Sequence, residues 1–338
     1  MKPLARHDLD VVTAVMEFCA ACGTRKSVKT SGPLAALMGL VALAAFPTTQ
    51  PSLAARKAFQ QEPRPSFSVD VSAVALDVVV TDSRGRFVTG LKQDDFLVLD
   101  QGVPQELVFF TADPTPVTIL VLLDSSASVR SKLQELQRAA NRFITRLSPG
   151  DTARVAFFHD RVVFGPRFTS DMKEHVAMIN QMRPQRSTHL YDALVASLEE
   201  LSPVQSRKAL LVFTDGDDEG SKVSVEEAFE AVRRSQVSVY AVGLLGWSSN
   251  DGMGINKGLL TQVTEYSGGR SFFPSNDNDM RTAFDRISDE LRRQYRLAYI
   301  PSDVKTENGW HRIEVRMTRR VDLAVRARLG YHRPQGTV

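Results

Sequence analysis

The stretch VTILVLLDSSASV (Val117–Val129) decides the fold of this chain. Its first seven residues are apolar or β-branched, which is typical of a strand buried on both faces of a parallel sheet. The run ends at Asp124, and small residues then alternate with hydroxyl residues. A second apolar run, Ala209–Phe213, ends in Thr214 and Asp215. The pattern predicts two buried strands that each carry an aspartate at the carboxyl end.

Around these two runs, between Thr118 and Tyr295, short apolar strands alternate with stretches of helical spacing. This alternation predicts an α/β fold, a doubly wound and mostly parallel sheet with helices on both faces. Further strands are expected at 154–159, 162–164, 237–242 and 271–273. Helices are expected at about 133–147, 172–182, 190–201, 225–235, 257–266 and 279–293.

Strand-like patterns return on both sides of this region. Val69–Thr81 precedes turn residues, and Phe96–Leu99 and Leu107–Phe110 flank a turn at 100–102. Alternating apolar residues recur after Gln294, at Tyr295, Leu297, Tyr299, Ile313, Val315, Met317, Leu323, Val325, Ala327 and Leu329. So few strands are marginal alone. We therefore expect a β module of residues 68–112 to pair with a C-terminal segment of residues 294–333, beside an α/β domain of residues 116–293.

The N-terminal region has the features of an export signal. The apolar run Pro33–Pro47 follows Arg25, Lys26 and Lys29 and precedes small residues that end at Ala54. This order predicts a signal peptide and N-terminal extension over 1–54, followed by a polar linker at 55–67. The alternative is an uncleaved membrane anchor. Either way we expect an exported protein that is periplasmic, attached to the cell surface or secreted.

Composition excludes several classes of function. The net charge is +3 and the basic residues are dispersed, so nucleic acid is not expected as a partner. The two cysteines, Cys19 and Cys22, lie within the predicted signal segment, so no thiol serves the folded part. The Gly-x-Ser-x-Gly motif of α/β-hydrolases is absent. The histidines show no zinc-type spacing with carboxylates.

The two strand-end aspartates indicate a cation site. Loops at the carboxyl ends of parallel strands meet at the point where strand order reverses. If the two strands are neighbours there, Asp124 and Asp215 face each other and repel unless a proton or cation lies between them. Ser126 and Ser128 add hydroxyl oxygens at alternate positions of an extended turn. Oxygen ligands without His or Cys suit Mg²⁺ first, with Mn²⁺ or Ca²⁺ as alternatives.

The combined motif resembles the metal-ion-dependent adhesion site of von Willebrand factor type A domains. Asp-x-Ser-x-Ser ends one apolar strand, a threonine follows in a loop, and Thr-Asp-Gly ends another strand. The resemblance implies metal ligation, directly or through water, by Asp124, Ser126, Ser128, Thr188 and Asp215. Two positions depart from the usual pattern: Ala127 stands where glycine is common, and Ser187 precedes the threonine where glycine is frequent.

The flanking segments are similar to those of exported bacterial proteins that contain a related domain. The similar residues before the domain include 76–81, Gly85, 88–91, 95–96 and 102–105; those after it are Arg292, Tyr295, Leu297, Tyr299, Arg328, Gly330 and Tyr331. This resemblance implies an exported bacterial protein, but it names no partner and no oligomeric state.

Local alternatives remain for the same residues. Asp124, Ser126 and Ser128 could instead cap the following helix. The acidic segment Asp215–Gly220, with Glu226, imitates an EF-hand calcium loop, although a strand precedes it and Ser224 with Glu227 forms a capping box. Outside these hypotheses, Asp217, Asp218 and Glu219 are interpreted as solvated acids.

The leading hypothesis for function is a non-enzymatic, adhesion-type protein-binding module. The cation keeps one coordination position open, and an Asp or Glu carboxylate of a partner protein completes it. Two alternatives belong to other classes: a metal-assisted hydrolase that uses the same crevice, and a scaffold protein with a vestigial metal site. A membrane is expected as a partner only through the uncleaved N-terminal anchor.

Overall fold

The computed structural model describes residues 73–185, 187–244, 256–302 and 309–333. The chain divides into residues 1–66 and a compact unit of residues 67–338. The predicted signal peptide and linker lie outside the described residues. Within the described part, no helix combines the length and apolar character needed to cross a membrane.

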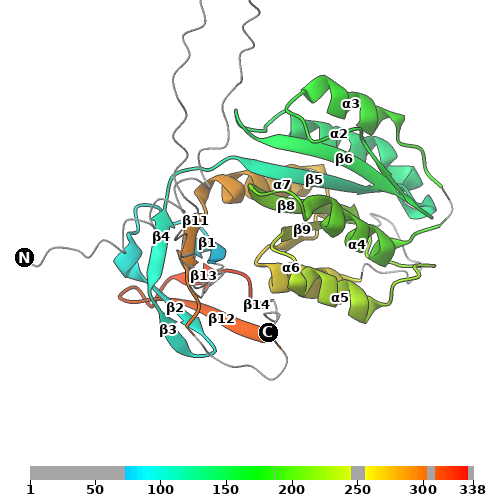
Figure 1. Cartoon of the computed structure of the whole chain (residues 1–338). Helices are drawn as coiled ribbons and strands as arrows, with labels where there is room; N and C mark the ends of the chain where they lie inside the picture. The colour runs from blue at the N-terminus through cyan, green and yellow to red at the C-terminus, as the bar shows by residue number, and fades with distance from the viewer. Residues whose placement is uncertain (1–72, 186, 245–255, 303–308, 334–338) are drawn as a thin grey trace, which may run out of the picture. The chain divides into compact units, whose positions relative to one another are not determined.

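A six-stranded sheet forms the centre of the α/β domain (Figure 1). Its strand order is β10-β9-β8-β5-β6-β7, and every neighbouring pair is parallel except β6 with β7. This confirms the predicted doubly wound, mostly parallel fold class. The strands are β5 (Val117–Asp124), β6 (Thr152–Phe158), β7 (Val162–Phe164), β8 (Arg207–Thr214), β9 (Ser238–Gly243) and β10 (Ser271–Phe272).

Helices cover both faces of this sheet. One face packs against α2 (Leu133–Ile144), α3 (Met172–Gln181) and α7 (Asp277–Arg293). The other packs against α4 (Leu190–Leu201), α5 (Val225–Arg234) and α6 (Lys257–Ser267). All eight residues of β5 are buried, and its alternate side chains enter the two different cores. This two-sided burial explains why the opening stretch is apolar without alternation.

A β-sandwich accompanies the α/β domain, and both of its sheets combine strands from before and after that domain (Figure 1). One sheet has the order β13-β1-β11-β4 and the other β14-β12-β2-β3, with antiparallel pairing throughout. The bounds are β1 (Val74–Thr81), β2 (Phe96–Asp100), β3 (Val103–Gln105), β4 (Leu107–Thr111), β11 (Tyr295–Tyr299), β12 (Trp310–Met317), β13 (Ala324–Arg326) and β14 (Gly330–His332); η1 (Gln93–Asp95) precedes β2.

Two details of the sandwich go beyond the strand pattern in the sequence. The partner of β2 across the turn at Gln101 and Gly102 is β3, whereas β4 pairs with β11 in the other sheet. The turn is tight because Gln101 and Gly102 both have positive φ, 50° and 79°, which brings residue 103 opposite Asp100 at once. Leu329 continues the alternating pattern of the sequence but is 45% exposed, because β13 ends at Arg326.

A buried polar network joins the two sheets. Asp100 of β2 is 1% exposed and accepts hydrogen bonds from the hydroxyls of Tyr299 and Tyr331, both at 2.9 Å. Its other oxygen lies 3.0 Å from Nδ1 of His311, which is equally buried. Burial and the neighbouring Asp100 carboxylate raise the pKa of Tyr299 far above its usual value. The carboxylate of Asp100, from the strands before the α/β domain, therefore binds three side chains of the C-terminal segment.

Candidate metal site

The two predicted acidic strand ends lie on neighbouring strands. β5 and β8 are parallel partners, with Leu123 opposite Phe213. Asp124 is the last residue of β5, and Asp215 directly follows β8. After β5 the chain continues into β6 on one side, then crosses to β8 on the other side. The two aspartates therefore lie where strand order reverses, which is the usual place for a ligand in such sheets.

Asp124 is fully buried and held in place by hydroxyl and amide donors. Its Oδ1 accepts a hydrogen bond from the Ser126 amide and its Oδ2 from the Thr214 hydroxyl, both at 2.8 Å. The Ser126 hydroxyl also bonds to this carboxylate. Burial raises the pKa of Asp124 to about 6; the nearby Asp215 charge adds to the rise, and the hydrogen bonds oppose it. Sequence reasoning missed Thr214, although the Thr-Asp-Gly motif contains it.

The loop after Asp124 differs from the extended turn that was expected. Ser126 has extended backbone angles, φ −70° and ψ 174°, and is 1% exposed. A 3-10 helix, η2 (Ala127–Lys132), begins at the next residue and includes Ser128, whose side chain is outside the described part of the structure. Ser126 occupies the N-cap position, but its side chain forms no capping hydrogen bond. The capping hypothesis therefore fails for Ser126.

Thr188 lies in a loop that is bonded to both acidic strand ends. Nearby, the Gln185 amide donates to the Ser125 carbonyl at 2.7 Å, which ties this loop to the residue after Asp124. The Thr188 carbonyl accepts from the Glu219 amide at 2.8 Å, which ties it to the loop after Asp215. Thr188 itself is 5% exposed. These bonds bring the loop of Thr188 together with those of Asp124 and Asp215.

The turn after Asp215 is also fixed. Oδ1 of Asp215 accepts from the Asp217 amide at 3.2 Å, and the Asp215 carbonyl accepts from the Asn256 amide at 3.1 Å. Gly216 has φ +85°, and a Cβ there would lie 3.3 Å from atoms of Asn256 and Leu260. Glycine is therefore needed for the turn that directs the chain away from β8.

The charge of the two aspartates is not balanced by an ion pair. Among the described residues, no basic side chain lies within 4.0 Å of either carboxylate. Asp215 does raise the pKa of Lys132, but burial of that amine lowers it more. Two carboxylates and buried hydroxyl oxygens without a base form a donor set that fits a hard divalent cation. The hydroxyl oxygens are essential to this set, because within the described chain no group of three His, Cys, Asp or Glu residues could hold a metal.

The calcium-loop alternative for 215–226 gains no support, because Asp218 is already bound to other groups of the protein. Asp218 accepts from the Tyr191 amide at 3.2 Å and from the Ser221 hydroxyl at 2.6 Å. Ser224 and Glu227 form the expected capping box at the start of α5. The interpretation of Asp218 as a solvated acid was therefore wrong, whereas Asp217 and Glu219 are exposed.

Asp192 is a second acid that sequence reasoning missed. Its carboxylate accepts from the Val223 amide at 2.9 Å and from the Lys222 amide at 3.0 Å. Together with Asp218 it ties the loop after Asp215 to the first turn of α4, directly after Thr188. No local signal marks Asp192, because its partners lie about thirty residues further along the chain.

Two histidines near the site, His159 and His189, contact residues other than the two aspartates. His159 pairs with Asp160. His189 packs against Gly220, where a Cβ would lie 2.7 Å from its Nε2, and its Nδ1 lies 3.7 Å from Asp192. None of these contacts is with Asp124 or Asp215.

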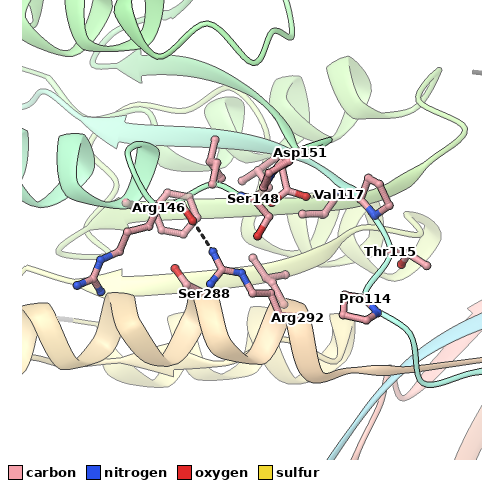
Figure 2. Close-up of a pocket in the computed structure, with 14 residues that line it drawn as sticks. Pro114, Thr115, Val117, Arg146, Ser148, Asp151, Ser288 and Arg292 are labelled. Atoms are coloured by element: carbon pink, nitrogen blue, oxygen red, sulfur yellow. Dashed lines mark hydrogen bonds between the residues drawn. The ribbon is translucent and has the colours of Figure 1, made fainter.

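Two cavities among the described residues lie away from the candidate site. A cavity of about 100 Å³ opens at the amino end of β5, between Thr115, Arg146 and Ser288 (Figure 2). Arg292 donates to the Arg146 carbonyl there, and Asp151 accepts from the Val117 amide at 3.0 Å. A second cavity of about 340 Å³ lies between α2 and α7. Neither of these two cavities contains a predicted metal ligand.

Comparison with known proteins supports this architecture. The sequence model of the von Willebrand factor type A domain matches residues 118–286, half of the 338 residues. No curated protein matches the sequence. Similar solved structures include a von Willebrand factor type A protein from Catenulispora acidiphila, with 10% identity over 75% of this chain and 71% of that one and a TM-score of 0.47.

Two further solved structures are similar. An aerotolerance-related membrane protein from Bacteroides fragilis has 18% identity over 52% of this chain and 98% of its own, with a TM-score of 0.43. The vWF domain of the type V pilus tip protein Mfa5 from Porphyromonas gingivalis has 10% identity over 53% and 95%, with a TM-score of 0.44. On the family match to residues 118–286, the chain belongs to the von Willebrand factor type A domain family.

Proposed function

We propose that this protein is an exported, divalent-cation-dependent protein-binding module of the adhesion type. Asp124, Ser126, Ser128, Thr188 and Asp215 would hold the cation, with Mg²⁺ the first choice and Mn²⁺ or Ca²⁺ as alternatives. When bound, the cation would offer a coordination position to an Asp or Glu carboxylate of the partner. The export signal that this proposal assumes lies in residues 1–54, outside the described residues.

The observation that carries the proposal is the burial of Asp124 beside Asp215 without a base. The Asp124 side chain is 0% exposed, and an ionised carboxylate in such a place is costly unless a cation compensates it. The hydroxyl of Thr214 and the amide of Ser126 orient it, so its position is set before any ligand arrives. Preorganised oxygen ligands are what a specific cation site requires.

The family supports an interaction module more than an enzyme. Catalysis by a bound water would need a general base close to both aspartates. The histidines near the site, His159 and His189, contact Asp160, Gly220 and Asp192 instead. The structure thus gives less support to the alternative, a metal-assisted hydrolase. A magnesium-dependent phosphoesterase activity that disappears in an Asp124→Ala variant would favour that alternative.

Partner capture tests the proposal directly. Crosslinked pull-downs from envelope fractions should recover the same partner with wild-type protein in Mg²⁺ and lose it in chelator. Asp124→Ala should lose the partner under both conditions, because the carboxylate between β5 and β8 is gone. Asp322→Ala is the control, since this exposed acid carries the same charge and belongs to the sandwich rather than to the candidate site.

The captured partner then provides the decisive variant. Replacing its contacting Asp or Glu by Asn or Gln should abolish binding, because an amide is a poor substitute for a carboxylate at a hard cation. Capture that survives chelator, or that persists with Asp124→Ala, would exclude the proposed mechanism.

A further inference from the structure

The C-terminal segment Ala324–Arg333, which we call the strap, contacts both halves of the compact unit. Its strands belong to the sandwich: β13 pairs with β1, and β14 pairs with β12. Its arginine side chains, however, extend to the helices of the α/β domain. The contacts fall at the carboxyl ends of these helices, where backbone carbonyls lack partners within the helix.

Arg328 binds the end of α5. Its Nη2 donates to the Ser235 carbonyl at 3.0 Å and to the Arg233 carbonyl at 3.3 Å, and Ser235 is the C-cap residue of α5. Burial lowers the pKa of Arg328 to about 10, so the guanidinium has given up solvent for these carbonyls. The next residue, Leu329, donates its amide to the Tyr266 carbonyl in the last turn of α6 at 3.3 Å.

Arg326 binds the end of α6. Its Nη1 donates to the carbonyls of Gly268 and Gly269, at 2.5 and 2.6 Å, directly after the helix ends at Ser267. Gly268 has φ +78°, and a Cβ there would lie 2.5 Å from the Arg328 amide nitrogen. The strap therefore passes so close to the end of α6 that only glycine fits.

The same arginine also holds α7. Nη2 of Arg326 lies 2.5 Å from Oε1 of Glu290, whose carboxylate is 1% exposed. The carbonyl of the next residue, Leu291, accepts from Arg207 at 2.5 Å, and Arg207 is itself held by Asp77 of β1 at 3.2 Å. Cations at helix carboxyl ends are favourable because they oppose the helix dipole.

We propose that the strap is a conformational clamp: it holds the carboxyl ends of α5, α6 and α7, so that order in the α/β domain depends on closure of the sandwich. The segment that matches the family, 118–286, stops before Glu290 and before the strap. It therefore lacks the groups that complete the ends of α5 and α6, and it lacks the end of α7 itself. The clamp is independent of the metal-site proposal, because the contacts lie away from the carboxyl ends of the strands.

Hydrogen exchange on the full chain tests the clamp. In Arg326→Ala, amides in the last turn of α6 should exchange at least about tenfold faster than in wild type. In Arg328→Ala, the same should hold for the last turn of α5. The reason is that local opening of the helix end no longer has to break the arginine–carbonyl hydrogen bonds. The strands β2 and β12 should keep their protection. Arg316→Ala is the matched control, since Arg316 is an exposed sandwich arginine that pairs with Glu314 of the same strand.

A milder variant keeps the test decisive if an alanine variant fails to fold. Arg328→Lys retains the charge but cannot reach two carbonyls with one planar group, so we expect faster exchange at the end of α5 alone. Unchanged exchange at the helix ends in the folded variants would overturn the proposal. Equal loss of protection across sandwich and helices in Arg328→Lys would also overturn it, because it would show a general loss of stability.

Discussion

Replacing Asp124 by Asn is expected to lower Mg²⁺ affinity by about 100-fold or more, because the variant loses a charged group of the site. The fold should survive. Asn can still accept the Ser126 amide, and the Thr214 hydroxyl can reverse its hydrogen bond. Isothermal titration with Mg²⁺, Mn²⁺ and Ca²⁺ measures the loss, and circular dichroism measures the retained helix content.

Thermal unfolding should show the electrostatic cause. Without metal, Asp124→Asn should unfold at a higher temperature than wild type, because it removes a buried charge that Asp215 repels. With saturating Mg²⁺ the order should reverse, because binding to the folded state stabilises only the wild type. Asp322→Asn, which changes an exposed acid of the sandwich, should follow wild type in both conditions. A wild type that neither binds cations nor gains stability from them would support the vestigial scaffold instead.

The second large effect is expected in the sandwich. Asp100→Ala should lower the free energy of unfolding by about 3–5 kcal/mol, the usual cost of removing one member of a buried charged network. His311, Tyr299 and Tyr331 would all lose their acceptor at once, and none of them can reach solvent readily. Urea unfolding followed by circular dichroism gives the value.

A surface acid provides the comparison for Asp100. Asp322 is exposed, lies between β12 and β13 of the same sandwich and pairs only loosely with Arg320 at 3.4 Å, so Asp322→Ala should change stability by less than about 1 kcal/mol. Asp100→Asn should fall between the two variants, because its amide oxygen still accepts one donor. Equal stability of Asp100→Ala and wild type would show that the network does not join the two sheets.

The sequence predicted those features that depend on local patterns. An unbroken apolar run identifies β5 as buried on both faces, and a strand that ends in an acid places that acid at the edge of a parallel sheet. Asp124 and Asp215 could therefore be placed at carboxyl strand ends, whereas the pairing of β5 with β8 was only a condition until the structure showed it. The capping box of Ser224 and Glu227 is equally local, because its residues are three apart.

The features that could not be predicted rest on distant partners. Asp100 stands before a Gln-Gly turn and looked like turn chemistry, but its partners lie about 200 residues away in the chain. Asp218 resembled a solvated acid, although it binds the first turn of α4 through the Tyr191 amide. The position of Thr188 depends on backbone bonds between three loops, and no residue pattern encodes such bonds.

The central claim is that Asp124 and Asp215 meet to hold a cation, and anomalous diffraction from crystals soaked in Mn²⁺ tests it most directly. The account predicts one strong manganese peak beyond the ends of β5 and β8. The hydroxyl oxygens of Ser126, Ser128 and Thr188 should surround it, with both carboxylates binding directly or through its waters. A map with no peak at this edge, or with the manganese held elsewhere, would contradict the account.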